Sequence, residues 1–216
     1  MKLDIRLRMV AGLIRPGIPL ADIGTDHAYL PVFLVENDII PSAVASDVKI
    51  GPMENARKTI VKSGLQDKVV PVLSDGLKEI PHSFTDFCMA GMGGELIAGI
   101  LEESPWVQKE GNHFVFQPQT HPEDLRRYLY DNGFEILKED VVKDRTRYYL
   151  AIEAVCTGVT EEHREADYYI GKLRETTSIH KGKYLEKVAS RLDVKLKATR
   201  DEKYGKLIDE ILEAAK

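Results

Sequence analysis

The sequence of 216 residues lacks the features that mark secreted, membrane-spanning and metal-binding proteins. It has only two cysteines, and no metal-ligand spacing joins them to its six histidines. No apolar run approaches the roughly 18 residues that a membrane-spanning helix needs. Residues 1–8 mix charges of both signs and lack the apolar stretch of a signal peptide. We therefore expect a cytoplasmic protein with no bound metal and no membrane partner, in which Cys88 and Cys156 are small buried hydrophobes.

Basic residues are also in deficit, and the formal net charge is −5. This balance argues against a protein whose whole surface coats nucleic acid, but it allows a local basic patch. Charges nearly balance from Glu161 onward, so the acidic excess lies before that residue. No proline follows Pro122, and long helices can therefore form in the tail.

What is present is the composition of a globular protein, with 43% hydrophobic and 30% charged residues. Apolar strand-like segments alternate with segments of helical periodicity. The expected strands are 20–23, 43–48, 68–73, 85–90 and 113–117, and the expected helices are 1–14, 27–37, 51–62, 95–101 and 122–132. This alternation predicts an α/β fold whose parallel sheet is covered on both faces.

The pattern changes after Gly133. Segments 134–142 and 147–155 are strand-like and lie too close together for a helical crossover, so they predict an antiparallel hairpin. Five parallel strands followed by such a hairpin are typical of Rossmann-like class I methyltransferases. The tail predicts two antiparallel helices, the second broken near Thr199. We accordingly expect an α/β domain over 1–157 and a helical domain over 158–216.

The segment Leu20 to Pro31 predicts a strand, a tight turn at Gly24 and a helix that begins near His27. Parallel sheets bind nucleotides at this kind of junction. A simpler interpretation is a βα turn in which Asp26 caps the helix.

Further loop residues stand at the ends of the neighbouring strands. Asp47 follows Gly24 at the distance expected of a carboxylate that binds a ribose, and Asp75 with Gly76 suits an adenine ring. Each aspartate taken singly is also a common turn or cap residue. The Ala90-Gly91-Met92-Gly93-Gly94 run completes the set.

The first loop does not contain the Gly-x-Gly-x-x-Gly pattern that lets a backbone approach a pyrophosphate. Carboxylates at Asp22 and Asp26 repel a diphosphate but attract a sulfonium and an ammonium. The loop therefore favours S-adenosyl-L-methionine over a dinucleotide.

Four motifs, in this order and spacing, resemble the bacterial family of tRNA (adenine-N1)-methyltransferases that modify adenine at tRNA position 22. They are Asp-Ile-Gly-Thr-Asp-His-Ala-Tyr-Leu-Pro (22–31), Ser-Asp-Gly-Leu (74–77), Ala-Gly-Met-Gly-Gly (90–94) and Gln-Pro (117–118). The resemblance extends over nearly the whole chain and implies a coiled-coil-like C-terminal domain. One departure is Gln119, where the family is expected to prefer Asn.

The resemblance implies a tRNA-modifying enzyme that uses S-adenosyl-L-methionine. Direct attack by the adenine N1 lone pair needs alignment rather than a metal or a strong nucleophile. The candidate catalytic residues are Asp26, which can stabilise or deprotonate the methylated base, and His27 and Tyr29, which can position it. For His27 and Tyr29 the alternatives are a helix start and a core residue. The candidate cofactor-binding residues are Asp22, Gly24, Asp26, His27, Asp47, Asp75, Gly76, Ala90, Gly91, Met92 and Gly93.

Basic residues near the expected site and along the tail are candidate phosphate contacts. They are Arg6, Arg8, Arg145, Arg147, His180, Lys181, Lys183, Lys187 and Arg191, although ordinary solvated positions explain any one of them. We hypothesise that the tail holds the tRNA body, and we favour a monomer. Two other functions stay open at this point: a non-catalytic RNA-binding or assembly protein that kept the fold, and a methyltransferase with a non-tRNA acceptor.

Overall fold

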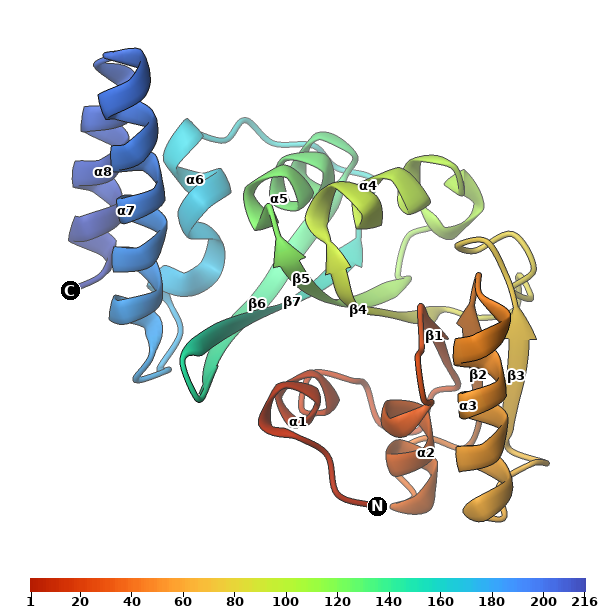
Figure 1. Cartoon of the computed structure of the whole chain (residues 1–216). Coiled ribbons are helices and arrows are strands. Elements are labelled where there is room, and N and C mark those ends of the chain that lie inside the picture. The colour runs from red at the N-terminus through yellow and green to blue at the C-terminus, as the bar shows by residue number, and fades with distance from the viewer.

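One mixed sheet of seven strands organises the computed structural model, which describes residues 1–216, in the order β3-β2-β1-β4-β5-β7-β6 (Figure 1). The strands are β1 (Leu20–Ile23), β2 (Ala43–Asp47), β3 (Val69–Leu73), β4 (Asp86–Gly93), β5 (His113–Thr120), β6 (Phe134–Asp144) and β7 (Arg147–Cys156). Strands β1 to β5 are parallel, whereas β7 runs antiparallel to both β5 and β6. The predicted parallel sheet with a terminal hairpin is confirmed.

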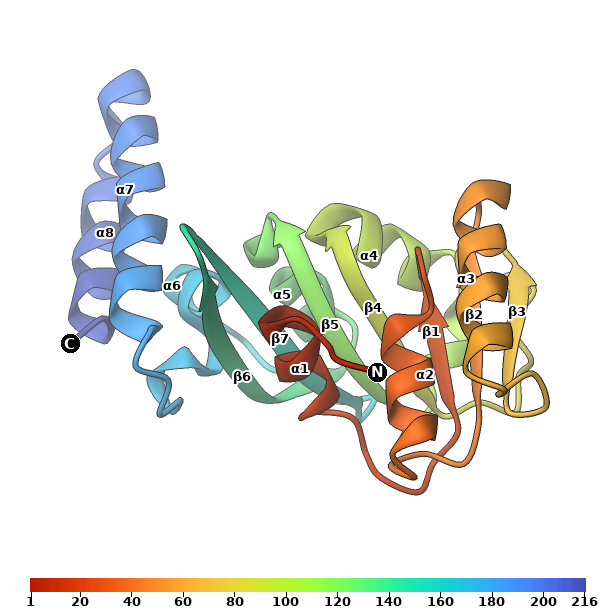
Figure 2. The same ribbon diagram turned by 60° about the horizontal axis from the view of Figure 1, so that its bottom comes forward.

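Helices cover both faces of the sheet, as the alternating pattern predicted (Figures 1 and 2). The helices are α1 (Ile5–Ala11), α2 (Tyr29–Glu36), α3 (Ile50–Lys62), α4 (Gly94–Glu102) and α5 (Pro122–Asp131). Successive strand side chains point to opposite faces, so Phe87 and Met89 join the core under α4 and α5, while Cys88 joins the core under α1 and α2. Both cysteines are buried and unpaired, as expected.

Two helices begin later than the apolar periodicity predicted. Helix α1 starts at Ile5 because the Asp4 side chain accepts a hydrogen bond from the Leu7 amide, and it ends at Ala11 rather than residue 14. Helix α2 starts at Tyr29 because Ala28 adopts a left-handed conformation with φ of 54°. His27 therefore lies in the loop, and the Asp26 side chain does not cap α2.

The tail forms a short helix and a helical hairpin, which corrects the prediction of two helices. The elements are α6 (Glu165–Ile170), α7 (Lys181–Thr199) and α8 (Lys203–Ala214), and short 3₁₀ turns lie at Pro105–Val107 and Gly171–Arg174. The predicted break near Thr199 is a full reversal, in which Arg200 has φ of 56°. A Cβ on Gly182, near the start of α7, would lie 2.8 Å from the Ala215 carbonyl oxygen, so α7 and α8 are antiparallel.

The tail shares its hydrophobic core with the sheet. Leu185 and Val188 of α7 belong to the same buried cluster as Phe114 and Ile152 of the central strands. The predicted boundary between 157 and 158 therefore divides one continuous core. None of the helices combines the length and the apolar character that crossing a membrane would require.

A buried ion pair fastens α5, β6 and the tail to one another. The Arg126 Nε donates to the Glu139 Oε1 at 2.7 Å, and both side chains are fully buried. The Arg126 Nη1 also donates to the carbonyl oxygens of Tyr168 and Tyr169 at 2.8 and 3.1 Å. Gly171 permits this approach, because a Cβ there would lie 2.2 Å from the Glu139 Oε2.

Candidate active site

A cavity of about 540 Å³ lies beside the carboxyl ends of β1 and β4. Strand β1 pairs with β2 on one side and with β4 on the other, so the connections leave in opposite directions at this point. Such a switch point is where open α/β sheets bind their ligands. The lining residues are Asp4, Arg6, Leu7, Asp22, Gly24, Thr25, Asp26, His27, Tyr29, Leu30, Ala90, Gly91, Gln119, Arg147 and Tyr149.

The loop after β1 is held by its own backbone and by one threonine. The amides of Gly24 and Thr25 both donate to the Ser46 carbonyl oxygen at 2.7 Å, and Gly24 has φ of 77°. The Thr25 hydroxyl accepts a hydrogen bond from the Ala28 amide at 3.1 Å. These bonds fix the turn that carries Asp26 and His27 toward the cavity.

Asp26, His27 and Tyr29 form a connected group at the mouth of the cavity. The His27 Nε2 lies 3.3 Å from the Asp26 Oδ2, and the His27 ring stacks on Tyr29 with 4.9 Å between ring centroids. Tyr29 is exposed rather than part of the core, and the His27 side chain is 38% exposed. The three candidate catalytic residues are therefore adjacent and accessible. A helix start at His27 and a core position for Tyr29, the alternative interpretations, would not require this arrangement.

Asp22 is the buried acid of the site, with only 5% of its surface exposed. Burial raises the pKa of Asp22 to about 6, while the Thr25 and Cys88 side chains and the charge of Arg6 oppose this rise. A carboxylate in such surroundings is a strong attractor for a cation, because little water competes for it.

The glycine run was predicted as a loop, but most of it extends β4, which pairs irregularly with β5 there. Gly91 has φ of 86°, and a Cβ on it would lie 3.7 Å from the Arg6 Nη1. The same Nη1 donates to the Gln117 Oε1 at 2.9 Å, and the Gln119 Nε2 donates to that oxygen at 3.1 Å. The hydrogen bond from Arg6 to Gln117 therefore connects α1 to β5 beside the cavity. Gln119, the residue that departs from the family pattern, has Gln117 as its hydrogen-bond partner.

Five of the predicted cofactor-binding residues lie outside this cavity: Asp47, Asp75, Gly76, Met92 and Gly93. Asp47 ends β2 and accepts a hydrogen bond from the Lys49 amide at 2.8 Å, and Asp75 follows β3 and pairs with Lys78. Both lie at the same edge of the sheet as the cavity, in the turn geometry that was the simpler alternative. Their contacts with a ribose or an adenine stay predictions.

The structure brings together the other predicted residues, and it adds some that the sequence did not reveal. Asp22, Gly24, Asp26, His27, Tyr29, Ala90 and Gly91 all line the cavity. Thr25 lies inside the first motif and lines the cavity, but a threonine at this position does not by itself indicate a ligand contact. Tyr149 gave no local signal at all, because only the pairing of β7 with β5 brings it to the cavity.

Six of the nine predicted phosphate contacts fall into two groups, while Arg145 lies in the turn between β6 and β7 and His180 and Lys181 lie at the start of α7. Arg6 lies in the cavity, the Arg8 guanidinium donates to the Leu3 carbonyl oxygen, and Lys183 pairs with Glu186. Lys187 and Arg191 line a second cavity that adjoins the first, and Arg147 lines both cavities.

One set of side chains has the geometry to offer metal ligands. Ligand atoms of Glu95, His121 and Asp124 lie within 4.8 Å of one another, but none of the three lines the cavity beside β1. The prediction that the protein works without a metal stays a prediction.

The donor set of the cavity fits S-adenosyl-L-methionine. A buried carboxylate at Asp22 and an exposed one at Asp26 suit an ammonium and a sulfonium. The positive φ angles of Gly24 and Gly91 leave backbone open to close approach. The loop after β1 carries a single glycine in place of the Gly-x-Gly-x-x-Gly pattern that admits a pyrophosphate.

Comparison with known proteins identifies a methyltransferase family. A family model described as a methyltransferase domain matches residues 3–152. The tRNA (adenine(22)-N(1))-methyltransferase of Bacillus subtilis is 35% identical over 155 residues, which span 71% of this chain and 65% of that enzyme, just under two thirds of its length.

Two solved structures superpose over almost the whole chain. Streptococcus pneumoniae Sp1610 in complex with S-adenosyl-L-methionine has a TM-score of 0.88 and 31% identity, covering 98% of this chain and 100% of that one. M. capricolum TrmK in complex with S-adenosyl-homocysteine has a TM-score of 0.80 and 29% identity, covering 99% and 96%. The chain belongs to the methyltransferase-domain family and, within it, to the bacterial tRNA (adenine(22)-N1)-methyltransferases that its motifs resemble.

Proposed function

We propose that this protein transfers a methyl group from S-adenosyl-L-methionine to N1 of the adenine at position 22 of tRNA. The observation that carries the proposal is the cavity between β1 and β4, where the buried acid Asp22 and the exposed group of Asp26, His27 and Tyr29 face one space. Family membership supports the same reaction.

The residues divide between the donor and the acceptor. When bound, S-adenosyl-L-methionine supplies a methyl group made electrophilic by its sulfonium. Asp22 would hold the ammonium group at the methionine end of the cofactor. The backbone at Gly24 and Gly91 would lie against that same end of the cofactor. Asp47 accepts hydrogen bonds from the ribose, and Asp75 accepts one from the adenine amine.

The acceptor base enters from the open side of the cavity. Adenine N1 lies on the Watson–Crick edge, so the base must leave its stack before it reaches the site. The exposed ring pair of His27 and Tyr29 positions the base by stacking, and its lone pair is then aligned for in-line attack. Asp26 stabilises the positive charge that the methylated base acquires, or accepts a proton from its N6.

This reaction needs no metal, because N1 is itself the nucleophile. With tRNA as its substrate, the protein is expected to act in the cytoplasm, and we favour a monomer.

Methyl transfer from labelled S-adenosyl-L-methionine tests the proposal. We expect label on an unmodified bacterial tRNA transcript with adenine at position 22, and none on the same transcript with guanine there. Cofactor binding without transfer would support a non-catalytic RNA-binding protein, and transfer to a small molecule or protein that is insensitive to tRNA and salt would support a different acceptor.

A further inference from the structure

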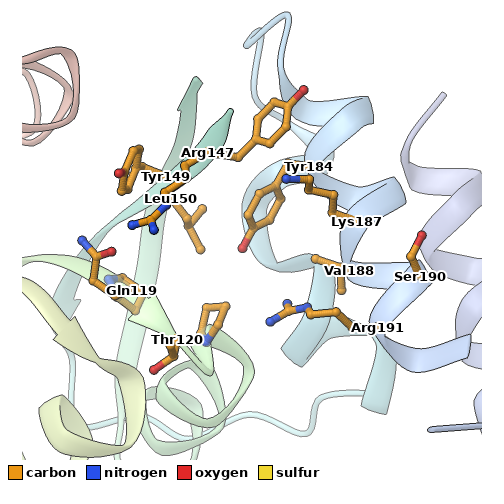
Figure 3. Close-up of a pocket in the computed structure, with 13 residues that line it drawn as sticks. Gln119, Thr120, Arg147, Tyr149, Leu150, Tyr184, Lys187, Val188, Ser190 and Arg191 are labelled. Atoms are coloured by element: carbon orange, nitrogen blue, oxygen red, sulfur yellow. The ribbon is translucent and has the colours of Figure 1, made fainter. Parts of the chain in front are cut away.

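A second cavity, of about 600 Å³, opens between the start of β7, the end of β5 and helix α7 (Figure 3). Figure 3 shows Gln119, Arg147 and Tyr149 on the sheet side of this cavity and Tyr184, Lys187 and Arg191 on the α7 side. We call this space the basic groove, defined by these six residues. It exists only because the tail packs against the hairpin.

The charge of the basic groove is of one sign. Its lining includes Arg147, Lys187 and Arg191 but no aspartate or glutamate, although the whole chain carries a net charge of −5. None of the three is paired with a carboxylate, whereas Lys183 and Lys197 on the same helix pair with Glu186 and Asp193. Three unneutralised cations in one concave space favour a polyanionic ligand.

The basic groove adjoins the active site. Gln119, Arg147 and Tyr149 line both cavities, so a ligand that fills one reaches the edge of the other without leaving the protein surface. A strand of RNA whose target base enters the active site can therefore continue across this border.

Tyr149 lies at the border, where it packs partly against the core and lines both cavities. Its side chain is half-buried, and its ring stacks on no other aromatic ring, unlike that of His27. The neighbouring Tyr148 ring already has the Lys187 and Lys143 ammonium groups 5.0 and 5.5 Å from its centroid. Every nucleobase has a face that stacks on such a ring, whatever its identity.

We propose that the basic groove binds the RNA nucleotide next to the target adenosine, with its base stacked on Tyr149 and the adjacent phosphates contacted by Arg147, Lys187 and Arg191. This inference rests on the proposed function and adds to it a binding site for the flanking strand. The groove holds the neighbour in place while the target base is turned out of its stack.

Charge removal on α7 tests the phosphate contacts. The pair Lys187→Ala and Arg191→Ala in the full chain should weaken binding of unmodified tRNA about tenfold and lower the salt slope of log Kd by about 1.5 to 2. The matched control, Lys183→Ala with Lys197→Ala, removes the same charge from the same helix and should change the affinity less than about twofold. Fluorescence anisotropy at several salt concentrations measures both, and equal effects of the two pairs would overturn the proposal.

A double-mutant cycle tests the stacking contact. Tyr149→Ala should weaken binding of intact tRNA about tenfold, and Tyr149→Phe should not. Removal of the base on one side of position 22, as an abasic nucleotide at 21 or 23, should abolish the effect of Tyr149→Ala. A loss of cofactor affinity would affect intact and abasic tRNA alike and cancel in the cycle.

Absence of coupling at both neighbouring positions would overturn the inference, while methylation by the unaltered protein would leave the proposed function standing. Absence of methylation by the unaltered protein would instead contradict the proposed function, and the two failures are therefore distinguishable.

Discussion

Asp22 is a buried carboxyl group with a raised pKa, a property that its position in β1 does not by itself require. Burial raises its pKa to about 6, so in the free protein the carboxyl group is largely protonated at pH 5 and ionised at pH 7. A cation such as the cofactor ammonium binds the ionised form. The affinity for S-adenosyl-L-methionine should therefore fall about tenfold between pH 7 and pH 5.

Isothermal titration calorimetry over this range measures that dependence, and Asp22→Asn should bind weakly with no change between pH 5 and 7. The pKa of Asp22 is higher in the folded chain than in the unfolded chain, so binding of a proton stabilises the fold at low pH. This stabilisation is lost as the pH rises through 6. The unliganded Asp22→Asn protein should accordingly have a higher Tm at pH 7. A wild-type affinity that is flat with pH would show that Asp22 does not hold the cation.

Asp26 and Asp47 should differ in what their loss changes. Asp26 lies beside His27 at the mouth of the cavity, so Asp26→Ala should lower kcat about a hundredfold with little change in cofactor affinity. Asp47 lies at the end of β2, so Asp47→Ala should weaken cofactor binding about tenfold and leave kcat at saturation nearly unchanged. Single-turnover kinetics and a binding titration separate the two, and parallel losses in both variants would show that the roles are misassigned.

Residues inside the first motif were predictable because strand, turn and carboxylates stand together in the sequence. Asp22, Gly24, Asp26 and His27 all reach the cavity. Tyr149 was not predictable, because its place depends on pairing between strands far apart in the chain.

At the scale of elements, the junction between β4 and α4 leaves no room for a side chain. Helix α4 begins directly at Gly94, where a Cβ would lie 2.1 Å from the His121 carbonyl oxygen. Gly94→Ala should lower the free energy of unfolding by about 3 kcal/mol, because backbone must move to admit the methyl group. Gly99, in the same helix, has open space around it, and Gly99→Ala should raise the free energy of unfolding by up to about 1 kcal/mol. Urea denaturation compares them; equal stability of the two variants would contradict this packing.

The sheet, the hairpin and most helices followed from periodicity, since each strand segment was short, apolar and bounded by turn residues. The errors have local causes. A left-handed residue at Ala28 delayed α2 without a glycine or proline to signal it, whereas the left-handed Arg200 turns the predicted break near Thr199 into a full reversal. Strand β4 continued through glycines because pairing with β5 extends it.

At the scale of the whole molecule, the Arg126 and Glu139 pair joins the sheet to the tail. Arg126→Met leaves Glu139 buried without a partner, and it should lower the free energy of unfolding by about 3 to 5 kcal/mol. Arg127→Met, next along α5, removes an exposed pair with Glu165 and a cation–π contact with the Tyr168 ring, and it should cost only about 1 kcal/mol. Addition of Glu139→Leu to Arg126→Met should recover part of the loss. Urea denaturation curves measure these free energies of unfolding. Similar losses for Arg126→Met and Arg127→Met would show that the ion pair between Arg126 and Glu139 does not hold the tail on the sheet.

The division at 157 and 158 remains a prediction from composition. Charge balance and helical periodicity both change near it, but a sequence does not show that tail residues such as Leu185 complete a core begun by the sheet. Residues of that shared core also line the basic groove, so the proposed binding of RNA and the stability of the fold depend on the same packing.

The central claim is methylation of one atom of one nucleotide. Its most direct test is to incubate the protein with S-adenosyl-L-methionine and unmodified bacterial tRNA, digest the product and identify the modified nucleoside and its position by mass spectrometry. The account predicts 1-methyladenosine at position 22 and nowhere else. A methyl group on another atom or at another position, or no methyl group at all, would contradict it.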